Sequence, residues 1–215
     1  MYALTADRRD SRSQTGTLDM AGHRDRLAAA HPECFRPWQL SAGDELQVLF
    51  AHPEPTVEAA LHLAETGRWH VGVGLGPLDE PVPDTVAEAT GDALERARAA
   101  VEAAKKAPSH AAIRSPRRAA GAARDADALL ALLASVRRRR TAPAREATAL
   151  ADQGLTQEQI AQQLEIDQSS VSRRLGSALW HQESDTRRLL VELIERAHRL
   201  SLDSEHLDPG QGAPR

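Results

Sequence analysis

TQEQIAQQLEIDQSSVSRRLG, residues Thr156–Gly176, has the pattern of two short helices joined by a tight turn. Thr156 and Gln159 match a capping box, in which a hydroxyl and a side-chain amide satisfy free backbone groups at a helix start. Asp167 follows a break in the apolar pattern and is a favourable N-cap for the second helix. The stretch therefore predicts a helix-turn-helix at 156–176. Its expected inward-facing residues are Ile160, Ala161, Leu164, Val171 and Leu175.

The second helix of this pair has an outward face without acidic side chains. Its residues are Gln168, Ser169, Ser172, Arg173 and Arg174. Glutamine can pair with adenine, arginine with guanine or phosphate, and serine with either, so this face suits a DNA major groove. The stretch resembles the helix-turn-helix of phage repressors and sigma factors, although Glu165 stands where that family usually has glycine for a positive φ. An ordinary helical hairpin with a polar face is the alternative interpretation.

Composition narrows the class of protein. A chain of 215 residues has room for one large or two small domains, and with only 3% aromatic residues its core must be mainly aliphatic and alanine-rich. The single cysteine, Cys34, excludes an internal disulfide and offers no zinc-binding spacing. No stretch is long and apolar enough for a membrane span, and the N-terminus lacks a signal-peptide pattern, so we expect a cytoplasmic protein.

The net charge of −4 hides an asymmetry along the chain. Residues 1–108 carry a net charge of −6, residues 109–182 of +4 and residues 183–215 of −2. The basic excess thus lies around the helix-turn-helix and the segment before it, where contacts to DNA phosphates are needed. Four consecutive arginines occupy positions 137–140 of that segment. A charge run is commonly a solvated face, but here we expect Arg138 and Arg139 to contact the DNA backbone.

The N-terminal half predicts alternating strands and helices. Strands are expected at 2–6, 35–40, 46–50 and 69–74, and helices at 19–30, 55–66 and 90–107. This βαββαβ order favours a ferredoxin-like α+β sandwich with an antiparallel sheet over residues 1–107.

Carboxylates are expected to meet at one end of this sheet. Asp7 ends the first strand, and Asp44 and Glu45 lie in the turn between the second and third strands. In a ferredoxin-like sheet the first and third strands are neighbours, which brings these side chains together. Such carboxylates repel one another unless a cation joins them, and a hard divalent ion, Mg²⁺ or Mn²⁺, is the usual solution. A solvated hairpin turn is the alternative interpretation.

Three short segments carry a resemblance to known families. LSAGDELQVLF (40–50), WHVGVGLGP (69–77) and ATGDALERARAA (89–100) resemble the palm domains of class III nucleotidyl cyclases and GGDEF proteins. In those families an aspartate that ends the first strand and one in the hairpin bind metal, so the resemblance implies metal binding at Asp7 and Asp44. With ADRRDSR (6–12), AGDELQ (42–47) and the C-terminal helix-turn-helix, the chain as a whole resembles the SatD-like family of bacteria.

This chain departs from the cyclase and GGDEF patterns at four positions. Glu95 and Ala99 stand where class III cyclases carry asparagine and arginine, Leu40 replaces the base-reading lysine, and Ala42 replaces a GGDEF glycine. These departures argue against cyclisation.

The C-terminal half is expected to be a linker, a helical domain and a tail. Residues 108–122 predict a flexible linker, residues 123–200 a helical DNA-binding domain, and residues 201–215 a disordered tail. A helix opening at Asp125–Asp127, a support helix at 144–152 and a final helix at 185–199 complete that domain. The apolar stripe of the last helix either forms a homodimer contact or completes the domain.

These features favour a bacterial transcriptional regulator that binds double-stranded DNA through its helix-turn-helix. The palm-like domain would sense a ligand such as a nucleotide, and no contact with a membrane is expected. The alternative is a nucleotide-binding or phosphoryl-transfer enzyme that depends on a divalent metal. A scaffold for protein interactions is a third interpretation.

Overall fold

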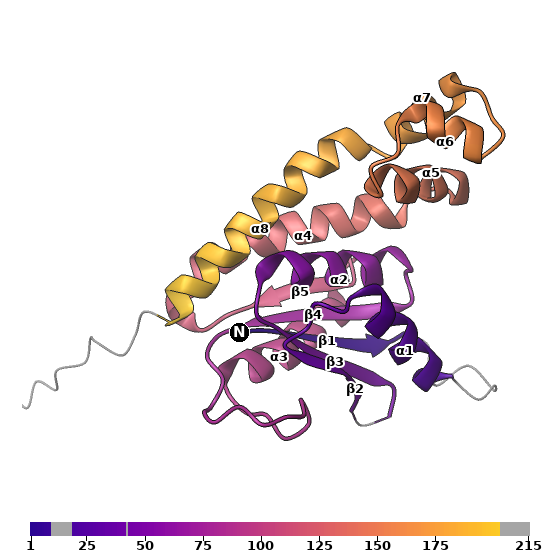
Figure 1. The fold of residues 1–215 in the computed structure, drawn as a ribbon. Helices are drawn as coiled ribbons and strands as arrows, with labels where there is room; N and C mark the ends of the chain where they lie inside the picture. Colours follow the sequence, from indigo (N-terminus) through magenta and orange to yellow (C-terminus); the bar gives the residue numbers. More distant parts are fainter. Residues whose placement is uncertain (10–18, 42, 203–215) are drawn as a thin grey trace, which may run out of the picture.

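The computed structural model describes residues 1–9, 19–41 and 43–202 and contains a five-stranded mixed sheet with the strand order β2-β3-β1-β4-β5 (Figure 1). The strands are β1 (Tyr2–Arg8), β2 (Arg36–Leu40), β3 (Glu45–Phe50), β4 (Trp69–Leu75) and β5 (Ala111–Arg114). β1 runs antiparallel to β3 and β4, and β2 runs antiparallel to β3. β2 contains Pro37 and forms an edge of the sheet, where a residue without a backbone N–H is tolerated.

Helices cover both faces of the sheet, so the predicted α+β class is confirmed. They are α1 (Met20–Ala30), α2 (Pro53–Glu65), α3 (Asp92–Lys106), α4 (Ala120–Arg138), α5 (Ala142–Asp152), α6 (Gln157–Gln163), α7 (Gln168–Ser177) and α8 (Trp180–Leu202), with a 3₁₀ turn η1 (Arg117–Ala119). α3 lies on one face, whereas α2, α4 and α8 lie on the other (Figure 1). Within the described ranges, no helix is long and apolar enough to cross a membrane.

The close approach of α3 to the sheet explains its alanine-rich sequence. Gly72 and Gly74 of β4 face this helix, and a Cβ on Gly72 would lie 2.5 Å from the carbonyl oxygen of Ala97. Only glycine in the strand and alanine in the helix allow the two backbones to lie so near. Ala93 and Ala97 are accordingly fully buried.

The prediction of a flexible linker at 108–122 is wrong, because this segment forms β5, η1 and the start of α4. β5 pairs in parallel with β4, which makes the sheet mixed rather than antiparallel. Asp127 holds the strand in place, because its carboxylate accepts hydrogen bonds from the Ile113 backbone N–H at 2.7 Å and from Arg114 at 2.9 Å. The helix therefore begins at Ala120, before the predicted start at Asp125.

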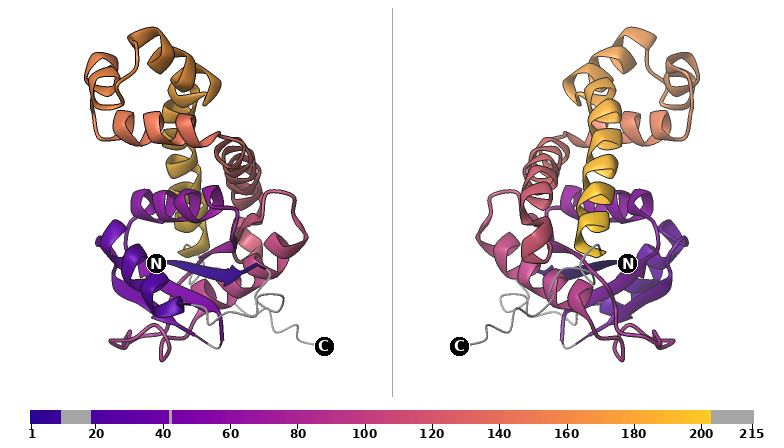
Figure 2. Two further views of the ribbon diagram at one scale, coloured as in Figure 1. Left: turned by 90° about the vertical axis from the view of Figure 1, so that its right-hand side faces the viewer. Right: turned by 90° about the vertical axis from the view of Figure 1, so that its left-hand side faces the viewer.

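α4 and α8 belong to the core of the sheet domain, so no boundary falls at residue 123. One cluster of buried residues joins Leu4 of β1 and Leu61 of α2 to Leu130 of α4 and Ile194 of α8. The two long helices run antiparallel, since Arg118 donates hydrogen bonds to the Ser201 carbonyl at one end and Arg137 pairs with Glu183 at the other. Together they carry α5, α6 and α7 away from the sheet (Figures 1 and 2).

The last helix differs from its prediction at both ends. α8 begins at Trp180 rather than at Asp185, and it continues through Ser201, which is fully buried. Residues 203–215 of the predicted tail lie outside the described residues. Of the stripe expected to form either a dimer contact or a core, Leu190, Ile194 and Ala197 are buried within the chain. Leu189 stays 47% exposed, and the homodimer remains a prediction.

Candidate functional site

The helix pair α6–α7 is built from local capping interactions. Thr156 Oγ1 accepts a hydrogen bond from the Gln159 N–H at 3.2 Å, and Gln159 Oε1 accepts one from the Thr156 N–H at 2.8 Å, so the predicted capping box is confirmed. Glu165 takes a φ of 53° in the turn, the conformation for which glycine is usual. Asp167 caps α7 by accepting from the Ser170 N–H at 2.8 Å, as predicted.

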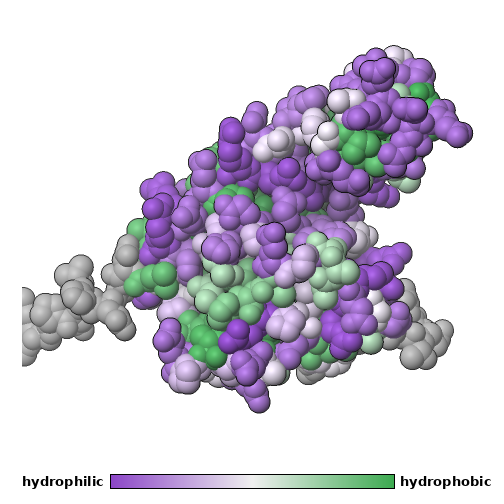
Figure 3. Space-filling model, viewed as in Figure 1, coloured by the Kyte–Doolittle hydropathy of each residue, from purple (hydrophilic) through white to green (hydrophobic). Residues whose placement is uncertain are grey.

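A small separate core holds these two helices against α5. Its buried residues are Ala147, Leu150, Ala151, Ile160, Ala161, Val171 and Leu175. α5 begins with Thr141 as N-cap and Pro143 in its first turn, which agrees with the predicted support helix. The unit α5–α7 forms the tip of the molecule, with a mainly hydrophilic surface on the side seen in Figure 3.

Four of the five residues predicted to read DNA are exposed on α7, namely Gln168, Ser169, Ser172 and Arg173. The fifth, Arg174, is only partly exposed, and its Nη1 lies 3.5 Å from Glu146 Oε2 on α5. That ion pair restrains the Arg174 guanidinium on the side of α7 that faces α5.

The N-cap of α7, Asp167, carries a fixed negative charge. Hydrogen bonds from the Ser169 and Ser170 hydroxyls, and from the Ser170 backbone, hold the pKa of Asp167 far below its usual range. An ionised carboxylate at a helix N-terminus stabilises the helix, but it also repels a phosphate placed directly at that terminus.

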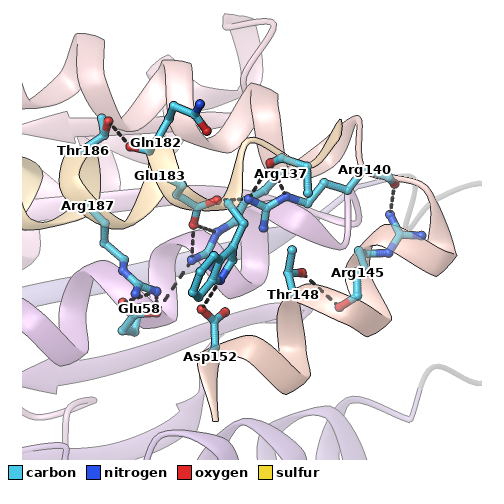
Figure 4. Close-up of polar contacts among 12 residues, drawn as sticks. Glu58, Arg137, Arg140, Arg145, Thr148, Asp152, Gln182, Glu183, Thr186 and Arg187 are labelled. Atoms are coloured by element: carbon cyan, nitrogen blue, oxygen red, sulfur yellow. Dashed lines mark hydrogen bonds and ion pairs between the residues drawn. The ribbon is translucent and has the colours of Figure 1, made fainter. Parts of the chain in front are cut away.

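The arginine run 137–140 is not the solvated face that its charge suggests. Arg137 and Arg140 are 5% and 7% exposed, and both pair with the buried carboxylate of Glu183 on α8 (Figure 4). Arg137 Nε donates to Glu183 Oε1 at 2.6 Å, and Arg140 also donates to the Ala178 carbonyl at 2.9 Å.

The two arginines predicted to contact DNA phosphates differ from each other. Arg139 is exposed, whereas Arg138 is half-buried and donates a hydrogen bond to the Pro108 carbonyl at 2.7 Å.

The basic excess between residues 109 and 182 also lies elsewhere than expected. Eight basic and two acidic residues lie between 109 and 140, whereas three basic and five acidic residues lie between 141 and 182. Most of the positive charge is thus on β5, η1 and α4 rather than on α5–α7.

The predicted carboxylate site is formed in part. Asp7 on β1 lies opposite Glu45 on β3, and Asp44 precedes Glu45 at the same end of the sheet. Burial raises the pKa of Glu45, and the charge of Asp7 acts in the same direction. Asp7 pairs with Lys105 at the end of α3, whose Nζ lies 3.1 Å from Asp7 Oδ2 and 2.8 Å from Glu102 Oε1.

The Lys105 ammonium therefore supplies the positive charge that the sequence assigns to a metal ion. In the described part of the chain, no group of three or more histidine, cysteine, aspartate or glutamate residues is arranged to hold a metal. As they lie, these residues do not fit Mg²⁺ or Mn²⁺ coordination, and the metal remains a prediction. Ala42 lies outside the described residues.

Sequence reasoning missed Glu183 and Lys105 as partners of the predicted residues. No local pattern pointed to Glu183, which lies 46 residues from Arg137 and 43 residues from Arg140. Comparison of the chain with protein-family models, with curated proteins and with solved structures gave no match. The function is therefore inferred from residues and geometry.

Proposed function

We propose that this protein binds double-stranded DNA through α7 and regulates transcription in response to a ligand sensed by its α/β body. The observation that carries the proposal is the capped pair α6–α7 at the tip of the molecule, with Gln168, Ser169, Ser172 and Arg173 exposed on one helix. A major groove is wide enough to admit an α-helix, and these side chains are donors suited to base edges.

The position of α7 supports this proposal. α4 and α8 carry the unit α5–α7 beyond the end of the sheet, and in both views of Figure 2 the tip lies clear of the α/β body. A duplex can thus approach α7 without meeting the acidic N-terminal half. The second helix of such a pair enters the groove with its N-terminal residues nearest the bases, which corresponds here to Gln168 and Ser169.

The charge distribution predicts a modest electrostatic contribution. With three basic residues between 141 and 182, and Arg139 exposed just before them, we expect about two or three phosphate contacts per chain. The logarithm of the binding constant should then fall with the logarithm of salt concentration with a slope of roughly −2 to −3. A protein of this kind would rely on base contacts, or on two copies, for high affinity.

The strand order of the body supports the resemblance to a palm domain. The four strands β2-β3-β1-β4 are antiparallel neighbours in the order of a ferredoxin-like sheet, with residues of α1 and α2 packed into the core on one face. The metal-dependent enzyme is the weaker alternative, because Lys105 pairs with Asp7. In addition, Glu95 and Ala99 stand where class III cyclases carry asparagine and arginine.

Selection of bound fragments from genomic DNA by the full-length protein tests the proposal. We expect enrichment of a short shared sequence, and a salt-dependent affinity for duplexes that contain it. Absence of enrichment, together with absence of salt-sensitive binding to any duplex, would show that the protein is not a DNA-binding regulator.

A further inference from the structure

A cleft of about 450 Å³ lies between the α/β body and the unit α5–α7. The ends of α2 and α4 and the residue Arg68 form its body side, and α5 forms the other side. Four arginines line it, namely Arg68, Arg137, Arg140 and Arg145. This volume is within the range of small-molecule sites.

The charges in this cleft are not balanced by its own carboxylates. Glu183 pairs with Arg137 and Arg140, and Asp152 accepts a hydrogen bond from Trp180 Nε1 at 2.9 Å (Figure 4). Glu65 and Asp152 are the lining carboxylates. Glu58, outside the lining, lies 3.9 Å from Arg137 Nη2 and also pairs with Arg187. The cleft is thus lined by four guanidinium groups and two carboxylates.

Two of the four guanidinium groups keep free donors. Within the described ranges, Arg68 makes no side-chain hydrogen bond or ion pair, and Arg145 uses only Nη1, which donates to the Arg140 carbonyl at 2.7 Å. Both residues are exposed, whereas the Arg137 and Arg140 side chains are buried and held in place by Glu183. The cleft therefore combines two rigid cations with two cations that can adjust to a ligand.

Burial raises the pKa of Glu65, although Arg137, Arg140 and Arg145 act on it in the opposite direction. Burial lowers the pKa of His62, so this imidazole adds no lasting positive charge at neutral pH. An anionic ligand would add the negative charge that the lining carboxylates do not supply.

We propose that this cleft binds a small phosphate-bearing metabolite, with Arg68 and Arg145 as direct ligands and with Arg137 and Arg140 behind them. Guanidinium groups match phosphate oxygens in paired hydrogen bonds. The anion would join Arg145 of α5 to Arg68 of the body, and so would restrain the orientation of α5–α7. A regulatory role for this restraint rests on the proposed function, in which α7 binds DNA and the metabolite changes the affinity of α7 for DNA. Binding of the anion to the cleft does not depend on the proposed function.

Calorimetric titration of the full-length protein with inorganic phosphate and with pyrophosphate, at matched ionic strength in chloride, tests the site. We expect saturable binding in the titration. In thermal melts at increasing anion concentration, we expect the melting temperature to rise with the logarithm of that concentration. Arg145→Gln and Arg68→Gln should each weaken binding by roughly tenfold or more, since each removes a charge-assisted contact. Glu65→Gln should strengthen it, because a competing negative charge is lost. Arg196→Gln, an exposed arginine on α8 outside the cleft, should leave it unchanged.

The outcomes separate the cleft from the DNA-binding proposal. No saturable binding of either anion, or equal binding by the cleft variants and the wild type, overturns the anion site even if DNA binds. Saturable anion binding that depends on Arg145, in a protein that binds no duplex, retains the site and overturns the regulator. A duplex that displaces pyrophosphate in direct competition would identify the phosphate as that of the DNA backbone, which overturns the metabolite.

Discussion

Replacement of Glu183 by glutamine should destabilise the protein more than any exposed charge substitution. Glu183 is 5% exposed and receives Arg137 Nε at 2.6 Å, with Arg140 on its other oxygen. Both arginines are themselves almost fully buried. The neutral amide therefore leaves Arg140 without a carboxylate partner and Arg137 with only the more distant Glu58, at 3.9 Å. Breaking a buried ion pair from one side costs about 3–5 kcal/mol, which is a large part of a typical domain stability of about 5–15 kcal/mol.

Urea denaturation followed by circular dichroism measures this loss. In a thermal melt of a chain of this size, each kcal/mol of lost stability lowers the melting temperature by roughly 2–4 °C. A fall of roughly 6–20 °C is therefore expected. Glu192→Gln, an exposed carboxylate on the same helix, is the matched control and should stay within about 0.5 kcal/mol of wild type. The triple variant Arg137→Met, Arg140→Leu and Glu183→Leu should recover much of the lost stability, because apolar side chains of similar volume remove all three buried charges together. A Glu183→Gln protein as stable as its control would refute the argument that these charges are desolvated.

Three further predictions concern DNA, metal and pH. Arg173→Ala should weaken specific DNA binding by about 1–3 kcal/mol in a fluorescence anisotropy titration, whereas Arg196→Ala should not; equal affinities would remove α7 from the interface. Lys105→Met should leave the Asp7 carboxylate facing Glu45 without its ammonium partner. Millimolar Mg²⁺ or Mn²⁺ should then raise the melting temperature of the variant more than that of the wild type, and no rise in either protein would exclude the metal. Burial, followed by the charge of His62, lowers the pKa of His31 from 6.5 to about 4, so the unfolded chain takes up a proton between these pH values while the folded chain does not. Stability should therefore fall by roughly 1–3 kcal/mol from pH 6.5 to 4, and an equal fall in His31→Gln would contradict this origin.

Sequence alone determined the features that depend on near neighbours. The capping box of Thr156 and Gln159 and the Asp167 cap follow from contacts within a few residues. Strands β1 to β4 follow from short apolar runs. The positive φ of Glu165 agrees with the resemblance to phage-repressor helix-turn-helices, in which this turn position usually carries glycine. Such features have the same local energetics wherever the segment lies in a fold.

Only the tertiary structure decided which segments join the sheet and which charges are buried. Ala111–Arg114 has no turn or apolar period that marks a strand, and it becomes one because β4 offers a free edge and Asp127 accepts the Ile113 N–H. Arg137 and Arg140 are 46 and 43 residues from Glu183, and no local pattern reports a partner at that distance. The free energy of a buried charge depends on the group that faces it after folding. The sequence therefore did not show that two of the four consecutive arginines, Arg137 and Arg140, are buried.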